Sequence, residues 1–197
     1  MEIMTFALIA LWVVVLVQLA LTYVLARQIG ILFERVSPVG AMISGSGPEL
    51  GSKVPELALP NLNGSGFVLG NAAGKSQLVF FLSTTCPICK ALLPALASIR
   101  DDEKPWLDVI LASDGREALH RRLIEDQKLQ GFPYVLSSEL GMTFKVAKLP
   151  FAVLIGPDGT VRAKGLVNSR EQLESLFTAS ETGVPSLQAS AGLSAVA

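Results

Sequence analysis

Two cysteines are the residues of this chain with the clearest capacity for chemistry. Cys86 and Cys89 are the only cysteines among 197 residues, and two residues separate them. At this spacing the sulfurs can close a small disulfide ring or open to a dithiol with little backbone movement. A thiolate is the nucleophile in thiol–disulfide exchange, so one cysteine can attack a partner while the other resolves the mixed disulfide. We therefore expect Cys86 and Cys89 to be catalytic, with their redox-active disulfide in place of a separate cofactor.

The segments on either side of the pair indicate how it is positioned. Residues 78–82 are all apolar, as in a buried strand, and residues 90–96 have the pattern of a helix. Free backbone N–H groups and the positive end of a helix dipole stabilise a thiolate at such a helix N-terminus. Pro87 suits the first turn, and Thr84 and Thr85 are candidate caps. We expect Thr85 and Pro87 to support the helix N-terminus.

A metal site is the main alternative use of two cysteines. Four-coordinate zinc would need a second Cys or His pair, and the chain offers only His120. His120 falls in a polar helix predicted over residues 117–127, so we expect a solvated side chain. The acids at residues 101–103 lie in a connection where nothing nearby completes a site. We predict no bound metal.

The N-terminal part of the chain is a candidate membrane anchor. No charged residue lies between Phe6 and Ala26, and a helix of that length spans roughly 31 Å, which matches a bilayer core. A cleavable signal peptide would have a basic n-region, whereas the first five residues contain no Lys or Arg. We expect an uncleaved single-pass anchor. Arg27 and Arg35 favour, by the positive-inside rule, a cytoplasmic domain.

Composition divides the chain into four parts. Residues 1–27 form the anchor, 28–52 a juxtamembrane segment with a flexible Gly- and Ser-rich linker, 53–179 a folded domain, and 180–197 a disordered tail. The formal net charge of −1, without a basic cluster, indicates no nucleic-acid partner.

Strands and helices alternate along the folded domain, which predicts an α/β sheet with an antiparallel part. Strands are expected at 66–69, 78–83, 107–112, 134–136, 151–155 and 161–164, and helices after Cys86, at 117–127 and at 169–177. Pro157-Asp158-Gly159 provides a hairpin turn between the last two strands.

This order of elements resembles the thioredoxin-like fold over residues 51–177, and residues 51–64 resemble the opening of its redoxin branch. Members of that branch carry a proline opposite the active-site pair, and Leu149-Pro150 fits its position. The resemblance implies a cis bond before Pro150 and a substrate groove at Leu149 and Pro150, where the backbone of Leu149 pairs with a client strand.

The layout of anchor, juxtamembrane segment 26–41 and redoxin domain is similar to that of the MauD family of methylamine utilisation proteins. The resemblance implies a single-pass protein of the inner membrane whose domain faces the periplasm. The implied client is disulfide-rich, namely the small subunit of methylamine dehydrogenase, in which disulfides would be formed or isomerised. After each exchange, an unidentified redox partner would restore the oxidation state of Cys86 and Cys89.

One departure from thioredoxins bears on the direction of exchange. Many thioredoxins carry an acid six positions before the first cysteine, where this chain has Phe80. Without that acid, deprotonation of Cys89 should be slow, which argues against efficient disulfide reduction and leaves client oxidation and isomerisation open. The alternatives are a membrane-tethered reductase of the cytochrome c maturation type and a non-catalytic, client-binding chaperone. Peroxidase activity is disfavoured, because Val79 stands where peroxiredoxins have a loop proline.

Overall fold

The computed structural model describes residues 2–35, 47–64, 66–70 and 74–182. The chain divides into two compact units, Met1–Ser37 and Pro38–Ala197. Residues 36–46 of the predicted juxtamembrane segment and linker, and all but the first three residues of the predicted tail, lie outside the described residues.

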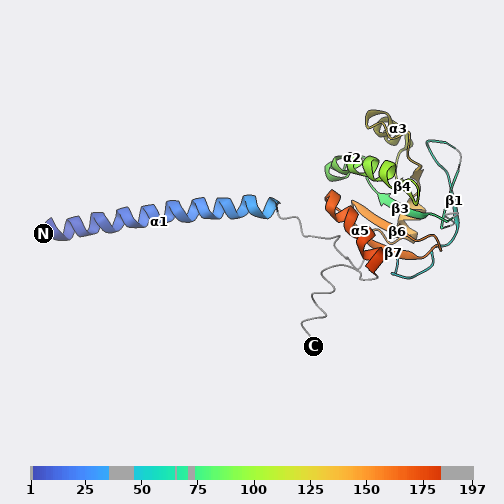
Figure 1. Cartoon of the computed structure of the whole chain (residues 1–197). Coiled ribbons are helices and arrows are strands. Elements are labelled where there is room, and N and C mark those ends of the chain that lie inside the picture. The colour runs from blue at the N-terminus through green and yellow to red at the C-terminus, as the bar shows by residue number, and fades with distance from the viewer. Residues whose placement is uncertain (1, 36–46, 65, 71–73, 183–197) are drawn as a thin grey trace. The chain divides into compact units, whose positions relative to one another are not determined.

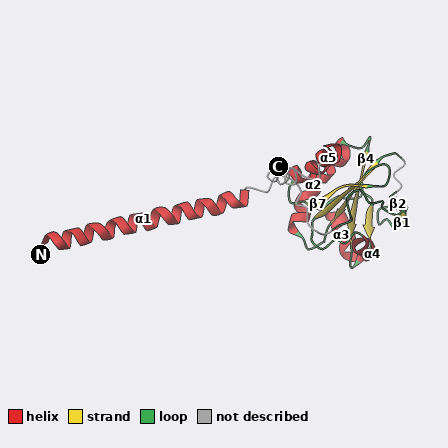
Figure 2. Ribbon diagram, turned by 90° about the horizontal axis from the view of Figure 1, so that it is seen from below, coloured by secondary structure: helices red, strands yellow, loops and turns green. Residues whose placement is uncertain are grey.

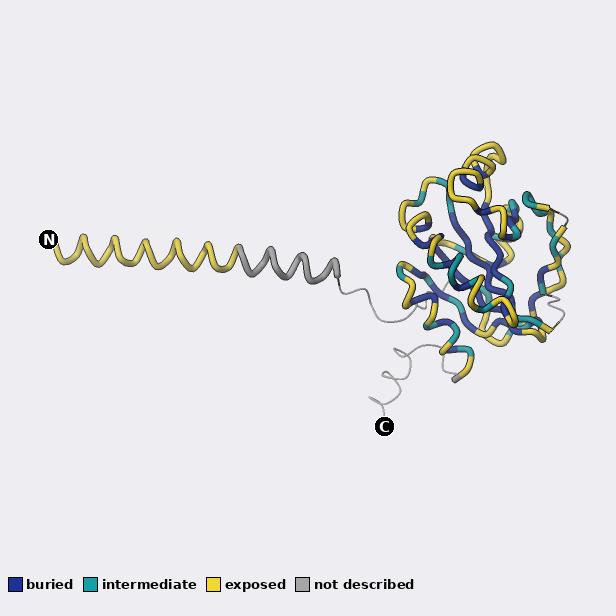
Figure 3. Tube along the Cα trace, turned by 45° about the horizontal axis from the view of Figure 1, so that its top comes forward, coloured by how far each residue is buried: buried dark blue, intermediate teal, exposed yellow. Residues whose placement is uncertain are grey.

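The first unit is one long helix, α1 (Glu2–Arg35), drawn in blue in Figure 1. Its stretch Glu2–Tyr23 has 22 residues, none of them buried, and is long and apolar enough to cross a membrane. Figure 3 shows the exposed residues running along this stretch without interruption. The helix continues beyond the predicted end of the anchor at residue 27 and finishes at Arg35.

The second unit is built on a five-stranded sheet in the order β5-β4-β3-β6-β7. The three strands from β5 to β3 are parallel, and β6 and β7 run antiparallel to their neighbours. A separate two-stranded sheet pairs β1 with β2. The strands are β1 (Leu57–Leu59), β2 (Phe67–Leu69), β3 (Ser76–Phe81), β4 (Leu107–Ser113), β5 (Tyr134–Leu136), β6 (Phe151–Ile155) and β7 (Val161–Leu166).

Helices cover both faces of the five-stranded sheet. The α2-side core contains residues of α2 (Pro87–Asp102), α3 (Glu117–Asp126) and α5 (Arg170–Thr182). The α4-side core contains residues of α4 (Ser138–Thr143) and of β2. Figure 2 shows α2 and α5 on one side of the strands and α4 on the other. The predicted mixed α/β architecture is therefore confirmed.

Strand β3 is the middle strand of the sheet, and both of its faces are buried. Phe80 belongs to the α2-side core and Val79 to the α4-side core, each with no exposed surface. A strand that is covered on both faces has a continuous apolar sequence, which explains the run at residues 78–82. The strand nevertheless begins earlier than predicted, since Ser76 and Gln77 already pair with β4.

Two elements, β1 and α4, were not predicted from the sequence. Helix α4 has only six residues, too few for a visible helical period. It is capped by Ser137, whose Oγ accepts a hydrogen bond from the backbone N–H of Leu140 at 3.1 Å. The predicted hairpin turn between β6 and β7 is confirmed, with Gly159 at a φ of 76°.

Candidate functional site

The turn from β3 into α2 brings the two cysteines together. Cys86 and Cys89 form a disulfide with their Cα atoms 5.3 Å apart. Cys86 is partly buried, whereas Cys89 is 1% exposed within the α2-side core. Cys86 is therefore the more exposed of the two, so a partner can approach its sulfur more easily than that of Cys89.

Cys86 is itself the N-cap of α2. Its Sγ accepts a hydrogen bond from the backbone N–H of Cys89 at 3.1 Å, and Pro87 opens the helix. The expectation that Thr84 or Thr85 caps the helix is wrong. The Oγ1 of Thr85 instead lies 3.1 Å from the Oγ of Ser83. The physical reason is that the sulfur occupies the place of a capping hydroxyl, so the helix N-terminus is directed at Cys86.

Leu149 and Pro150 lie at the same end of the sheet as the disulfide. The bond between them is cis, as predicted. The next residue, Phe151, pairs with Phe81, the last residue of β3 before the redox turn. Leu149 is 40% exposed whereas Pro150 is buried. The fold thus brings two separate segments, the redox turn and the Leu149-Pro150 turn, to one edge.

The core around Cys89 is apolar. Phe80 belongs to the same core, is fully buried and pairs with Leu111 on one side and Ala152 on the other. None of the described residues that are buried is an aspartate or a glutamate. No described carboxylate therefore stands where many thioredoxins have theirs.

His120 is not solvated, which corrects the expectation from the sequence. It is 1% exposed, and its Nε2 lies 2.8 Å from the backbone carbonyl oxygen of Asp114. A carbonyl only accepts, so Nε2 carries the proton. Nδ1 lies 2.8 Å from the hydroxyl oxygen of Tyr134. The spacing of His120 to the buried Leu123 and Ile124, three and four residues on, was the signal that indicated a core-facing position.

The polar contacts of His120 continue through Tyr134 and Ser113 toward the redox turn. Burial raises the pKa of Tyr134 far above its ordinary value, opposed by a hydrogen bond with Ser113. The hydroxyl of Ser113 in turn donates to the carbonyl of Leu82 at 2.7 Å. We name His120, Tyr134 and Ser113 the polar network. It holds Leu82, four residues before Cys86, and nothing in the sequence indicated it.

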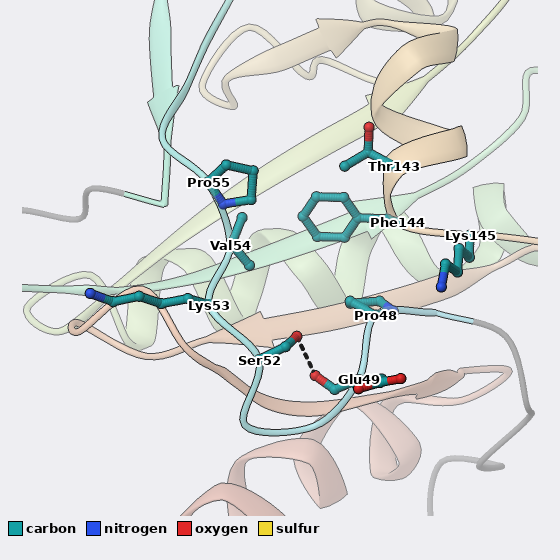
Figure 4. Close-up of a pocket in the computed structure, with 9 residues that line it drawn as sticks. All are labelled: Pro48, Glu49, Ser52, Lys53, Val54, Pro55, Thr143, Phe144 and Lys145. Atoms are coloured by element: carbon teal, nitrogen blue, oxygen red, sulfur yellow. Dashed lines mark hydrogen bonds between the residues drawn. The ribbon is translucent and has the colours of Figure 1, made fainter.

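A separate cavity of about 250 Å³ lies away from the disulfide. Figure 4 shows Pro48, Glu49 and residues 52–55 on one wall and Thr143, Phe144 and Lys145 on the other. Neither cysteine lines it, and neither does Leu149. Among the described residues, no group of three or more His, Cys, Asp and Glu side chains is placed to hold a metal ion.

Known proteins resemble this chain over most of its length. The profile of the AhpC/TSA family matches residues 50–164. The methylamine utilization protein MauD of Paracoccus versutus is 43% identical over 180 residues, which cover 91% of this chain and 90% of that protein.

Solved structures share the fold of the second unit. The thioredoxin domain of a thiol-disulfide oxidoreductase from Bacteroides vulgatus has a TM-score of 0.57 at 22% identity, covering 66% of this chain and 97% of that one. A secreted disulfide oxidoreductase of Mycobacterium tuberculosis, homologous to DsbE of E. coli, has a TM-score of 0.51 at 19% identity, covering 63% and 96%. With its thioredoxin-like fold and paired cysteines, the chain belongs to the MauD family of methylamine utilisation proteins, within the AhpC/TSA family.

Proposed function

We propose that Cys86 and Cys89 form or isomerise disulfides in a periplasmic client, the small subunit of methylamine dehydrogenase. The observation that carries this proposal is the disulfide at the N-terminus of α2, with Cys86 accessible and Cys89 buried. The client is inferred from the family, whose name concerns methylamine utilisation.

Client oxidation would proceed in two exchanges. A client thiolate attacks Sγ of Cys86, the bond to Cys89 breaks, and Cys89 leaves as the thiolate. A second client thiolate then attacks the client sulfur of the mixed disulfide and releases Cys86. Two electrons pass to the pair and the client thiols lose two protons. The N–H of Cys89, 3.1 Å from Sγ of Cys86, would stabilise the departing Cys86 thiolate.

The apolar surroundings of Cys89 support the direction of this exchange. In client reduction the Cys89 thiol must lose its proton to expel the client, and no described buried carboxylate is available to accept it. In client oxidation Cys89 needs no base for the attacking step, because it leaves as a thiolate. Phe80 in the α2-side core therefore favours oxidation or isomerisation over reduction.

Leu149 and Pro150 would form the client groove. The exposed Leu149 lies beside a cis proline at the end of β6, and its backbone would pair with an extended client segment next to Cys86. We place α1 in the inner membrane as a single-pass anchor and the second unit in the periplasm. Arg27 and Arg35 oppose that orientation.

A reductase of the cytochrome c maturation type is the second candidate. One observation favours it, the similarity in fold to a secreted oxidoreductase homologous to DsbE of E. coli. A reductase would hold its cysteines as a dithiol in the cell, whereas a disulfide donor would hold them oxidised. Labelling of intact cells with a membrane-impermeant alkylating agent, before and after mild reduction, separates the two and also reports the orientation.

The test of the function is trapping of the mixed disulfide. In Cys89→Ser the thiolate of Cys86 attacks a disulfide of the small subunit and releases one client thiol. Without Cys89 to resolve it, this mixed disulfide should accumulate as a covalent complex, detectable on a non-reducing gel and by mass spectrometry. Cys86→Ser is the matched control and should trap far less. Equal amounts of the covalent complex with both variants would contradict the roles assigned to Cys86 and Cys89. Client maturation that survives in Cys86→Ser would instead indicate a chaperone without redox chemistry.

A further inference from the structure

A hollow beside the redox turn is not explained by the exchange reaction itself. Its inner part has a volume of about 330 Å³ and is walled by the ends of β3 and β4, by α4 and by residues 146–149. Its outer part shares Asp114, Gly141, Val146 and Ala147 with the inner part and reaches Met142 and Lys145. We name the two parts together the α4 hollow.

The α4 hollow is continuous with the proposed client groove. Leu149, the residue before the cis proline, forms part of its wall, and so does Leu82, which leads into the redox turn. An extended client segment that pairs with Leu149 would therefore pass the mouth of the hollow. Side chains alternate between the two faces of a strand, so residues next to the client cysteine would be directed away from the disulfide.

The size and lining of the hollow suit a side chain. A volume near 330 Å³ is at the lower limit of about 300–1,000 Å³ for small-molecule pockets. Phe81, Leu82, Ala112 and Val146 contribute apolar surface to the inner part. Ser113 also lines it, but its hydroxyl is already bound to the carbonyl of Leu82. The hollow therefore offers mainly apolar contact.

Exposed apolar residues gather around the same edge. Among the described residues of the second unit, seven large apolar side chains are more than a third exposed, and three of them belong to the redox turn, α4 and the Leu149-Pro150 turn. These are Ile88 at 47%, Met142 at 71% and Leu149 at 40%. Methionine adapts its shape to different partners, and grouped exposed apolar residues mark interaction sites.

The charges at the rim indicate a further property of the partner. Lys145, Lys148 and Asp114 are the charged residues that line the α4 hollow, and Lys90 is exposed directly after Cys89. The lining therefore carries two lysines against one aspartate, and this net positive charge favours acidic segments.

We infer that the α4 hollow receives a large apolar side chain next to the client cysteine, in a client segment that also carries acidic residues. This inference rests on the proposed function and names the class of segment that the site selects. The hollow selects between cysteines of a disulfide-rich client, since a cysteine without such neighbours gains nothing from it.

Gly141 allows the hollow to be filled without disturbing the fold. It lines both parts, and a Cβ added there would meet no atom within 4 Å. Gly141→Leu should therefore occupy the hollow, and Gly141→Ala is the matched control that leaves most of it open. Lys148→Glu reverses a rim charge, with the exposed Lys104→Glu at the opposite end of β4 as its control.

The full-length oxidised protein in detergent is mixed with two dithiol peptides of equal cysteine spacing. One carries Leu and Asp beside its first cysteine, and the other carries Ser and Lys. Acid quenching, alkylation and mass spectrometry give the second-order rate constant for each peptide and for glutathione, which is too small to reach the hollow.

We expect the wild type to oxidise the Leu/Asp peptide about tenfold faster than the Ser/Lys peptide, because only the Leu/Asp peptide buries a large apolar side chain in the hollow. Gly141→Leu should abolish the preference and leave the glutathione rate unchanged. Lys148→Glu should reduce the preference, and both controls should behave like the wild type. Equal peptide rates in the wild type, or a preference that survives Gly141→Leu and Lys148→Glu, would overturn the inference. Exchange with neither peptide nor glutathione would overturn the proposed function, and this inference with it.

Discussion

Two regions of the α2-side core handle polar groups in opposite ways. Around Cys89 the core is apolar, with Phe80 where many thioredoxins have an acid. Around Tyr134 the same core buries a histidine, a phenol and a serine. Each of these three polar side chains has a hydrogen-bond partner, so their burial is compensated. The difference indicates that the polar network is structural, whereas the region of the disulfide omits a group that would assist reduction.

Phe80→Asp should give the largest effect and would remove the contrast between the two regions. A carboxyl in that position has no described partner, and removal of the ring leaves a cavity, so the free energy of unfolding should fall by about 4 kcal/mol. The acid should at the same time accelerate reduction of a model disulfide. Urea denaturation and the rate of insulin reduction measure the two effects.

Phe80→Leu is the control for lost volume. It should cost about 1 kcal/mol and leave the rate of reduction unchanged. If Phe80→Asp is no faster than Phe80→Leu, the missing acid does not set the direction of exchange.

His120→Ala tests the polar network directly. It removes the hydrogen bond between His120 and the hydroxyl of Tyr134 and opens a cavity, so unfolding should become easier by about 3 kcal/mol. The rate of exchange with glutathione should change little, because the hydrogen bond from the network to the redox turn goes to the carbonyl of Leu82, four residues before Cys86. A large loss of exchange without a loss of stability would mean that His120 takes part in the chemistry.

The pH dependence of stability should distinguish Tyr134 from an ordinary tyrosine. Burial raises its pKa in the folded state, so the folded chain holds the phenol proton more tightly than the unfolded chain does. The contribution of Tyr134 to the free energy of unfolding is therefore complete below pH 10 and is lost above it, by about 1.4 kcal/mol per pH unit. Tyr134→Phe should lower stability near pH 7 by about 1 kcal/mol and remove this alkaline decline. An unchanged decline in that variant would assign it to other groups.

The ends of α3 and α4, helices that pack in the α2-side core and the α4-side core respectively, provide the smallest test. Lys128 after α3 and Lys145 after α4 have φ values of 53° and 49°, in the left-handed region that glycine prefers. Lys128→Gly and Lys145→Gly should each raise the free energy of unfolding by up to about 1 kcal/mol. Only Lys145→Gly should weaken preference for an acidic peptide, since only Lys145 lines the α4 hollow. A loss of stability in either variant would show that the lysine side chain matters more than its backbone strain.

Most strands were predictable because their signals are local. The strands at 134–136 and 151–155 match β5 and β6, and the Pro157-Asp158-Gly159 turn lies where expected. The start of β3 was missed because Gln77 is polar, yet it is 1% exposed. Its side chain accepts from the backbone N–H of Gly70 at 2.9 Å and donates to the carbonyl of Val68 at 3.0 Å. These hydrogen bonds join Gln77 to Val68 in β2 and to Gly70, so the local sequence of β3 does not reveal them.

The sequence by itself determined the chemistry of this protein and the elements that present it. Two cysteines at fixed spacing between a strand and a helix, a proline at the start of a later strand and one long apolar helix are properties of short segments, and short segments carry their own signals. The tertiary structure alone decided that His120 is buried, that Cys86 caps its own helix, and that α4 walls a hollow beside Leu149. These depend on which surfaces meet when distant segments pack, because burial and cavities are properties of the contact between elements rather than of either element.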